Sequence, residues 1–417
     1  MGLAQTVSGI EVGSFKDWNR KMKFLARCGI ICVCLLLAGR AANASAPCTP
    51  AFPLQRGLPQ GWLGADAAYS IPLPGGRDVW MFGDTLYGKH RVIKNNIPVM
   101  VRNSIGISTC THGHWKLKYF IKKNPDGQAT DFFQAQHPRT WYWAMDGFVA
   151  GRDLWVMLLC VRNTPAKSQA MGFETCGTDL ARILSPGPDP QKWKIDYFPL
   201  VPDGVHAYPS AAAVRNNGYE YLYALKESGQ RPLLVTRLPL NSLSDPAASL
   251  QYLASDGKWR DGFHPSAAKE VMVKGSPELS IRYHAKLGKW VAILFEPEGF
   301  SSRILLRTAP SPLGPWSDGQ VIYKVPEMQP DNPDYDKNTF CYAAKEHPEF
   351  ERDDLVITYA CNTFDIPRLA SDLKIYFPQV VRLPMPQLKE GAQNEYCGTA
   401  IRTRSGDQGK KSLGGAN

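Results

Sequence analysis

The sequence has 417 residues, of which 44% are hydrophobic and 11% are aromatic, with 36 glycines and 33 prolines. This composition is typical of a globular protein with many turns, and the lack of long apolar helical stretches favours an all-β fold. Of the net charge of +10, residues 1–44 carry +4 and residues 398–417 carry +3, which leaves about +3 for the rest of the chain. This weak charge, without a basic stripe, excludes nucleic acid as an expected partner.

The N-terminal segment has the order of parts of an export signal. Residues 22–27 are basic, residues 28–39 form an apolar run of 12, and residues 42–44 supply a small-x-small cleavage site. The run is shorter than the ~20 residues that span a bilayer. We therefore expect residues 1–44 to be a signal peptide and the mature protein to be secreted or periplasmic, with no membrane association after cleavage. Residues 1–21 are polar, so Met22 is an alternative start; a retained anchor and cleavage after Ala46 are the alternatives for the segment.

Seven of the ten cysteines lie outside this segment, and an exporting pathway allows them to form disulfides. We expect Cys341 and Cys361 to join neighbouring strands of one hairpin, and Cys160 and Cys176 to close a loop. An odd number leaves at least one thiol unpaired or paired between chains. None has the spacing of a zinc site, so we assign no metal-binding residues.

One pattern then recurs five times along the chain. A strand rich in small residues is followed by a turn and by an apolar strand that carries Trp or Tyr. The turns contain Gly or Asn-Gly, which supply the positive φ angles of tight hairpins. The strand pairs are 65–70 with 79–82, 144–149 with 154–158, 208–213 with 219–225, 277–282 with 290–295, and 340–345 with 355–359.

The repeats recur every 62 to 80 residues, which is longer than the ~40–50 residues of a four-stranded blade and leaves room for long loops. Small residues suit strands crowded around an axis, and bulky residues suit the space between blades. The sequence therefore predicts one five-bladed β-propeller over residues 45–397; a β-sandwich would not give five similar hairpins. Residues 398–417 are rich in Gly, Ser and Lys and are expected to form a disordered tail.

Equivalent positions on the first strand of each repeat should converge at one mouth of the axial channel. These positions are Asp66, Asp146, Tyr208, Glu278 and approximately Tyr342. Three carboxylates among small residues are unexpected for packing alone, because buried carboxylates are costly unless they are paired or functional. Asp84 is a fourth candidate, since Gly83 before it allows a kink that would aim it at the channel.

Several other side chains could line the same mouth. Arg102 and Asn103 follow the first hairpin and could bind sugar hydroxyls, and His347 flanks the fifth repeat, as His137 and His206 flank the second and third. Exposed aromatic residues could stack on sugar rings, although most aromatic residues of the repeat belong in the core. The stacking candidates are Trp62, Tyr69, Trp141, Trp143 and Tyr208.

The segments 64–70, 80–85 and 102–105 resemble the propellers of domain of unknown function 4185, some of which are grouped in glycoside hydrolase family 183 and act on D-arabinan. The segment 307–316 is similar to a signature of the wider five-bladed arabinanase-like clan. The resemblance implies that the catalytic aspartates are Asp66 and Asp84, which match the family's D…GDT pattern. It also carries the expectation of a β-propeller that hydrolyses a polysaccharide.

Clustered acids are what glycoside hydrolysis requires, because one protonated carboxyl group donates to the leaving oxygen while a second carboxylate acts at the anomeric carbon. We therefore expect an exported glycoside hydrolase with Asp66 and Asp84 as the acid/base pair. Asp146, Glu278, Arg102, Asn103, Tyr208 and His347 are expected to bind substrate or tune pKa values. No cofactor is required by this chemistry, and a cation in the channel is left open. The alternative is a non-catalytic, lectin-like propeller that binds carbohydrate at the same mouth.

Overall fold

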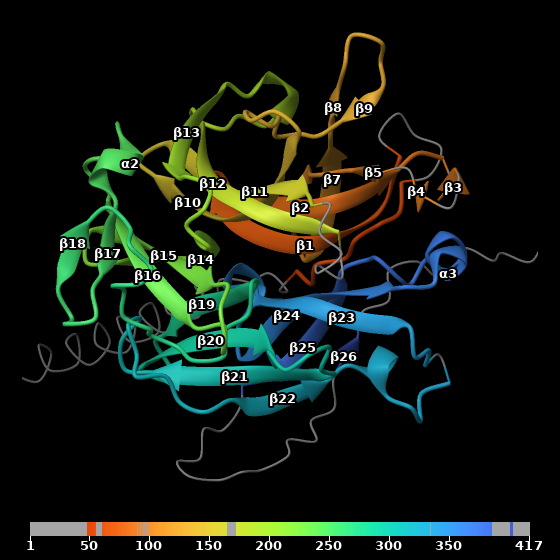
Figure 1. Cartoon of the computed structure of the whole chain (residues 1–417). Helices are drawn as coiled ribbons and strands as arrows, with labels where there is room; N and C mark the ends of the chain where they lie inside the picture. Colours follow the sequence, from red (N-terminus) through yellow and green to blue (C-terminus); the bar gives the residue numbers. More distant parts are fainter. Residues whose placement is uncertain are drawn as a thin grey trace, which may run out of the picture. The chain divides into compact units, whose positions relative to one another are not determined.

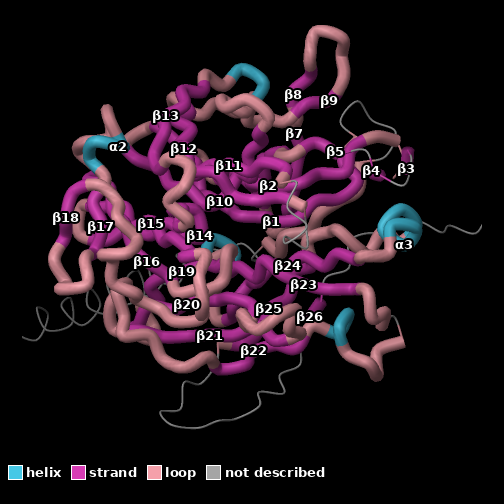
Figure 2. The backbone as a smooth tube through the Cα atoms, viewed as in Figure 1, coloured by secondary structure: helices cyan, strands magenta, loops and turns pink. Residues whose placement is uncertain are grey.

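The computed structural model describes residues 48–55, 61–89, 91, 93–94, 97–98, 100–164, 172–333, 335–385 and 401–402. The expected signal peptide, its alternative start and Cys397 lie outside the described residues. Within the unit that spans Pro47–Asn417, the fold consists almost entirely of antiparallel strands (Figures 1 and 2). No helix of the described part is long and apolar enough to cross a membrane.

Five sheets, each built from one continuous stretch of chain, form the blades. Blade 1 contains β1 (Trp62–Leu73), β2 (Arg77–Tyr87), β5 (Met100–Val101), β6 (Ser104–Thr111) and β7 (His114–Phe120). Blade 2 contains β10 (Thr140–Ala150), β11 (Asp153–Asn163), β12 (Phe173–Ile183) and β13 (Ile195–Val201). Blade 3 contains β14 (Ala207–Asn216), β15 (Tyr219–Lys226), β16 (Leu233–Pro239), β17 (Gln251–Leu253) and β18 (Trp259–Asp261). Blade 4 contains β19 (Leu279–His284), β20 (Lys289–Phe295), β21 (Arg303–Ala309) and β22 (Gln320–Lys324). Blade 5 contains β23 (Thr339–Glu346), β24 (Asp354–Thr363), β25 (Gln379–Pro384) and β26 (Ile401–Arg402).

Short elements occupy the connections between these strands. They are the hairpins β3 (Ile93–Lys94) with β4 (Ile97–Pro98) and β8 (Lys122–Lys123) with β9 (Ala129–Thr130), the helices α2 (Pro246–Ser249) and α3 (Ile366–Ser371), and the 3-10 turns η1 (Pro190–Lys192), η2 (Pro326–Met328) and η3 (Pro348–Phe350).

The five predicted hairpins are the first two strands of the five blades, which confirms the five-bladed propeller. Each first strand contacts the first strand of the next blade, in the order β1, β10, β14, β19 and β23, and β23 contacts β1 again. The innermost strands therefore close a ring around an axis. Ile401 and Arg402, which lie in the segment expected to be a tail, pair with the outer edge of β25.

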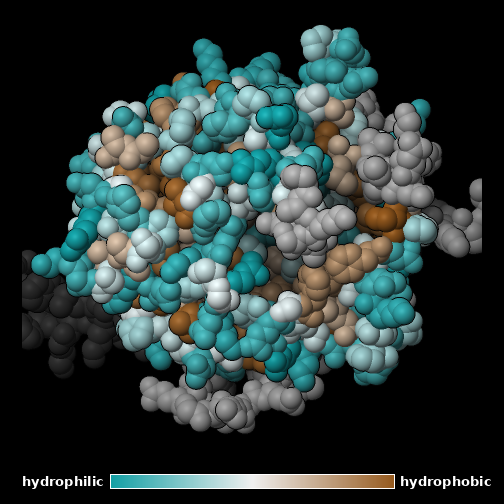
Figure 3. All heavy atoms as spheres, viewed as in Figure 1, coloured by the Kyte–Doolittle hydropathy of each residue, from teal (hydrophilic) through white to brown (hydrophobic). Residues whose placement is uncertain are grey.

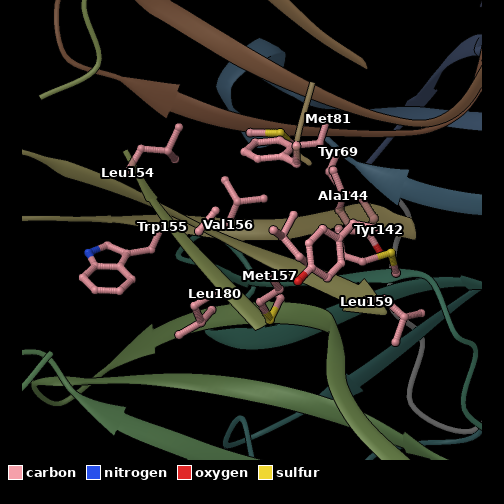
Figure 4. Close-up of a cluster of buried hydrophobic side chains, with 14 of the residues drawn as sticks. Tyr69, Met81, Tyr142, Ala144, Leu154, Trp155, Val156, Met157, Leu159 and Leu180 are labelled. Atoms are coloured by element: carbon pink, nitrogen blue, oxygen red, sulfur yellow. The ribbon is translucent and has the colours of Figure 1, made fainter. Parts of the chain in front are cut away.

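The core lies between the blades rather than at the axis. The second strand of each blade is almost fully buried, and its alternating side chains contact the blades on both sides. Figure 4 shows this between the first two blades, where Tyr69 and Met81 of blade 1 gather with Ala144, Val156 and Met157 of blade 2. Bulky residues of the second strands thus hold neighbouring blades together, as their sequence pattern indicates.

The ring closes between blades 5 and 1 without a shared sheet. An apolar cluster crosses this joint, in which the ring of Trp62 lies 5.4 Å from that of Phe377 and the ring of Trp80 stacks on that of Phe350 at 5.7 Å. The buried guanidinium of Arg91 adds polar contacts, which are treated below with the residues they position.

Three disulfides lie in the described part of the chain. Cys341–Cys361 joins β23 to β24 and Cys160–Cys176 joins β11 to β12, which confirms both expected pairings, and Cys48–Cys110 ties the segment before β1 to β6. Three disulfides indicate that the protein folds in an oxidising compartment, outside the cytoplasm.

Candidate active site at the mouth of the propeller

Irregular pairing in the innermost strands places the acidic side chains. The register between the first and second strands shifts in blade 1 at Asp66, in blade 2 across residues 145–146, in blade 3 across residues 210–211 and in blade 5 across residues 343–344. A β-bulge of this kind re-aims the side chain that it carries. The residues in these bulges are small because the backbone there takes strained, positive φ angles. Ala67, Ala68 and Ala343 have φ angles of 64°, 65° and 63°.

Asp66 is half-buried in the bulge of blade 1 and is held from blade 5. The hydroxyl of Tyr342 donates to its Oδ2 at 2.7 Å, and the hydroxyl of Tyr376 donates to the same oxygen at 3.3 Å. Burial, together with the negative charges of Asp84 and Glu278, raises the pKa of Asp66 to about 8, although Tyr342 and Lys345 act in the opposite direction. Asp66 is therefore protonated at neutral pH.

Asp84 lies on β2 at the same break in the register. Ala65 pairs with Thr85 and Ala67 pairs with Phe82, so Asp66 faces the step Gly83–Asp84 across the hairpin. A Cβ atom on Gly83 would lie 2.4 Å from Oδ1 of Asp66, which explains why glycine occupies this position. The glycine predicted to aim Asp84 thus makes room for Asp66.

The carboxylate of Asp84 is fixed by two donors. Nε1 of Trp143 donates to Oδ1 at 3.0 Å, and the guanidinium of Arg102 donates to Oδ2 at 3.1 Å. Burial raises the pKa of Asp84, and the charge of Arg102 and the hydrogen bond of Trp143 limit the rise. Arg102 also lies over the ring of Trp141 at 4.4 Å from its centroid.

Glu278 precedes β19 and brings a third carboxylate to this mouth. Its Oε2 accepts a hydrogen bond from Nζ of Lys345 at 2.7 Å, and the Lys345 side chain is 1% exposed. Burial lowers the pKa of Lys345, and the charges of Glu278, Asp66 and Asp146 oppose that change. The ammonium also lies over the ring of Tyr69. Lys345 is thus the cation that partly balances the acids, and it occupies a bulged strand whose small-residue pattern gave no hint of it.

Asp146 is placed differently from the other acids. Its side chain is 1% exposed, and its two oxygens accept from the backbone N–H groups of Gly147 and Ala213 at 2.8 and 2.9 Å. The guanidinium of Arg282 lies 3.7 Å away. Asp146 therefore links the innermost strands of blades 2 and 3, with both oxygens engaged by the backbone.

Two further candidates also serve internal contacts. Asn103 is fully buried, and its amide bonds the backbone of Phe133 and Tyr142 with all three contacts between 2.7 and 3.2 Å. His347 is 1% exposed, with Nδ1 2.6 Å from the hydroxyl of Ser70 and Nε2 2.7 Å from that of Thr358. Burial and nearby cations lower the pKa of His347 far below its usual value, so the ring is neutral.

Tyr208 does not occupy the position equivalent to Asp66. The bulge of blade 3 falls at Ser210 and Ala211, and Tyr208 is 3% exposed within the core cluster of blades 1 to 3. The phase of the third repeat was therefore off by two residues, because bulges add residues that a sequence alignment of hairpins does not reveal.

The aromatic candidates divide into core and mouth residues. Trp62 and Tyr69 are buried, and Trp62 stacks on Tyr119 with centroids 4.0 Å apart. Trp141 and Trp143 contact Arg102 and Asp84, as described above. His137 pairs with Asp179 at 3.0 Å, and His206 lies 4.0 Å from Glu227.

An exposed aromatic patch, defined as Phe300, Phe340 and Phe364, leads from the surface towards Asp66. Phe300 and Phe364 are 54% and 56% exposed, and their rings lie 4.5 and 4.6 Å from that of buried Phe340. Phe340 in turn stacks on Tyr342, the residue that donates to Asp66. Figure 3 shows apolar surface near β23 and α3 on the visible face. The patch was missed because its members come from three separate loops and strand ends.

A groove of about 1020 Å³ lies on blade 2, and Asp66, Asp84 and Glu278 are not among its lining residues. It is lined by Arg102 and Trp141, and further along by Arg139, Arg162 and Asp179. Arg102 lines the groove and also donates to Asp84, so this one side chain connects the groove with the carboxylates.

Arg91 secures the joint at which this mouth is built. Its guanidinium donates to the carbonyls of Leu63 in blade 1 and of Leu369, Asp372 and Ile375 in the segment around α3, at 2.6 to 3.0 Å. The next carbonyl, that of Tyr376, lies 3.5 Å away. Arg91 therefore holds the loop that carries the second tyrosine of Asp66.

Two groups of described side chains have the spacing of metal ligands. In one, Glu327 lies beside Cys341 and Cys361, but these cysteines form a disulfide and cannot ligate an ion. The other is His284 with Glu346 and Glu351, at the ends of β19 and β23 and just after η3.

Comparison with known proteins gives the fold a context. A candidate hydrolase from Bacteroides ovatus shares 20% identity with a TM-score of 0.60, over 78% of this chain and 86% of that chain. An exo-β-1,3-galactanase from Phanerochaete chrysosporium shares 11% identity with a TM-score of 0.46, over 81% of this chain and 64% of that one. The GH43_1 enzyme from Xanthomonas citri complexed with xylotriose shares 12% identity with a TM-score of 0.43, over 82% of this chain and 92% of that chain. No curated protein matches the chain.

The family model that matches is that of domain of unknown function 5005, over residues 56–382. The expected assignment to domain of unknown function 4185 is therefore wrong. The motifs that suggested it describe one bulged hairpin with an Asp on each strand, and such a hairpin does not by itself distinguish one propeller family from another. The chain belongs to the family of domain of unknown function 5005.

Proposed function

We propose that the protein is a glycoside hydrolase that cleaves a polysaccharide at the mouth of the propeller, with Asp66 as the general acid. The observation that carries this proposal is the pKa of Asp66, which burial and two neighbouring carboxylates raise to about 8. A carboxyl group that stays protonated at neutral pH beside carboxylates held by cations is the arrangement that glycoside hydrolysis uses.

Asp66 is suited to donate its proton to the glycosidic oxygen. Both tyrosine hydroxyls donate to Oδ2, which leaves Oδ1 to carry the proton. The departing sugar oxygen takes this proton as its bond to the anomeric carbon breaks, and Asp66 becomes a carboxylate. Tyr342 and Tyr376 then stabilise the new charge through the hydrogen bonds that they already make.

Asp84 is proposed as the base that removes a proton from the attacking water. It faces Asp66 across one hairpin, and its carboxylate is fixed by Trp143 and by Arg102, which also lines the groove of blade 2. Glu278 is instead assigned to pKa tuning, because Lys345 holds its carboxylate and its charge raises the pKa of Asp66. Arg102 would orient Asp84, while Asp146, Asn103 and His347 would support the mouth from inside.

The substrate is proposed to be a glycan with several units. Sugar rings expose C–H faces that stack on aromatic side chains, and the aromatic patch of Phe300, Phe340 and Phe364 lies on the blade 5 side of Asp66. The groove of blade 2 lies on the other side. An extracellular glycan also agrees with export by the N-terminal segment, to a secreted or periplasmic location.

The experiment is a reducing-end assay of the purified protein on a panel of plant, fungal and bacterial polysaccharides, arabinans included. On the substrate found, Asp66→Asn and Asp84→Asn should each lower kcat by ~10³-fold or more, with melting temperatures no lower than that of the unaltered protein. Asp256→Asn is the matched control, because this exposed acid pairs only with Arg260 and a backbone N–H in a distant turn. Full activity of either active-site variant would refute its assignment. Saturable binding of a glycan without release of reducing ends would refute hydrolysis and favour the lectin-like alternative.

A further inference from the structure

Three side chains with metal-ligand chemistry meet between blades 4 and 5, at the far ends of their innermost strands. His284 is the last residue of β19, Glu346 is the last residue of β23, and Glu351 follows η3. Of the acid site, Glu278 precedes β19 and so lies at the opposite end of that strand, and Tyr342 lies in the middle of β23. The cluster is therefore separate from the mouth that contains Asp66.

The ligand atoms of the three residues lie within 4.8 Å of one another. The Glu346 side chain is fully buried, and that of His284 is 9% exposed. Nε2 of His284 and Oε1 of Glu346 lie 2.5 Å apart as an ion pair, and Glu351 shares a side-chain hydrogen bond with Glu346. Outside the cluster, neither this nitrogen nor either oxygen of Glu346 has a hydrogen-bond partner among the described residues. Buried polar atoms are almost always satisfied, so three buried atoms whose polar contacts stay within the cluster require an explanation.

The charged groups around the cluster do not explain these buried atoms. Arg282 is a buried cation that interacts with Glu346, but it also interacts with Asp146, Glu220 and Glu349. Val356 donates its backbone N–H to Oε1 of Glu351 at 3.0 Å, which orients that carboxylate without neutralising it. The acids of this region therefore outnumber the cations available to them.

We propose that His284, Glu346 and Glu351 bind one divalent cation of the Zn²⁺ or Mn²⁺ type, which joins blade 4 to blade 5. One imidazole nitrogen with two carboxylates is a ligand set that these ions accept, whereas an imidazole ligand is less suited to Ca²⁺ or Mg²⁺, which prefer oxygen. The imidazole binds through Nε2, and the backbone contact of Glu351 serves as an outer hydrogen bond that fixes the ligand. The site would be structural, because it lies away from the acids at the mouth.

The test is metal binding by the purified protein, read out without any substrate. The protein is dialysed against a chelator and then titrated calorimetrically with ZnCl₂, MnCl₂, CaCl₂ and MgCl₂ in separate experiments, and melting temperatures are measured with and without each ion. We expect one equivalent of Zn²⁺ or Mn²⁺ to bind and to raise the melting temperature, since a ligand that binds only the folded state stabilises it. Ca²⁺ and Mg²⁺ should bind more weakly.

Glu346→Gln and Glu351→Gln should each weaken binding by ~100-fold or more, because each removes a ligand charge. Asp353→Asn is the control, since this exposed acid lies two residues after Glu351 and pairs with Lys286 outside the cluster. If the altered proteins do not fold, the titration of the unaltered protein still decides whether the protein binds a cation. Failure of the unaltered protein to bind Zn²⁺ or Mn²⁺ would overturn the proposal, and a gain in stability of Glu351→Gln would then mean that the two glutamates share a proton. Because no step uses glycan, this result is independent of the proposed hydrolysis.

Discussion

Asp66 and Asp84 face each other across a single hairpin, where the pairing of β1 with β2 shifts register and Gly83 leaves room for the carboxyl group of Asp66. This placement couples the two acids through space, since the charge of Asp84 is among the causes that raise the pKa of Asp66. The same hairpin therefore determines the distance between the acids, their orientation and their protonation. Each of these properties can be changed by a single substitution.

Glu278→Gln should move the alkaline limb of the pH profile to lower pH. A general acid must be protonated, so activity should fall as the pH rises through the pKa of Asp66, about 8. Removal of the Glu278 charge lowers that pKa, and it also frees Lys345, whose charge lowers it further. The measurement is kcat/KM against pH, with Glu270→Gln, an exposed acid paired with Lys226, as control. An unchanged alkaline limb would exclude Glu278 from tuning Asp66.

Asp66→Asn should stabilise the fold at alkaline pH. The pKa of Asp66 is higher in the folded chain than in the unfolded chain, so the folded state binds more protons and its stability falls between about pH 4 and pH 8. The neutral amide does not titrate, and the variant should exceed the unaltered protein by ~1–3 kcal/mol above pH 8. Denaturant melts at pH 5 and pH 9 check this: the advantage of the variant must grow with pH, and a constant or falling difference would contradict it.

Gly83→Ala should reduce activity while leaving the fold intact. The new methyl group would lie 2.4 Å from Oδ1 of Asp66 and would push the carboxyl group away from its position. We expect kcat to fall by ~10²-fold, as small displacements of a catalytic group often cause. Gly187→Ala is the control, because a Cβ atom there meets nothing within 4 Å. Equal activities of the two variants would show that the fit at Gly83 does not matter.

Arg91→Ala should destabilise the joint between blades 5 and 1. The substitution leaves several buried carbonyls without their donor, and we expect a loss of ~2–4 kcal/mol. Arg91→Lys should recover only part of it, since an ammonium cannot reach as many acceptors as the guanidinium. Thermal unfolding measures the loss, and hydrogen exchange at Tyr376 should increase in both variants. If Arg91→Lys is as stable as the unaltered protein, the several N–H donors of the guanidinium are not required.

Phe300→Ala and Phe364→Ala should weaken substrate binding. Each removes an exposed ring that can stack on a sugar, which is expected to raise KM by roughly 3- to 10-fold with little change in kcat. Tyr283→Ala is the control, because this residue is 55% exposed but lies near the far end of β19. If all three variants have the same KM, the patch does not form part of the binding surface.

The sequence was sufficient to predict the five hairpins, because alternation of small, apolar and turn residues follows directly from the crowding of strands around an axis. It also indicated Asp66, Asp84 and Glu278, which stand out as acids among small residues, and the structure brings all three to one mouth. It assigned the wrong family, since the blade 1 motif is not specific enough.

Other parts of the site could not be predicted for physical reasons. Tyr208 was misplaced because bulges change the phase of a strand without a marker in the sequence. Asn103 and His347 are polar residues whose partners inside the fold are visible only in three dimensions. Lys345 and Tyr376 were missed because Lys345 reaches Glu278 from 67 residues away along the chain and Tyr376 reaches Asp66 from 310 residues away.

The joint between blades 5 and 1 has a consequence for how the protein could lose activity. It is the one blade boundary of the described chain that no peptide linkage between successive blades crosses, and Asp66 on one side is held by Tyr342 and Tyr376 on the other. A small separation at this joint would let water reach Asp66 and lower its pKa towards that of an ordinary aspartate. Asp66 would then lose its proton at neutral pH before the blades unfold. Inactivation by heat should therefore precede the loss of β-structure.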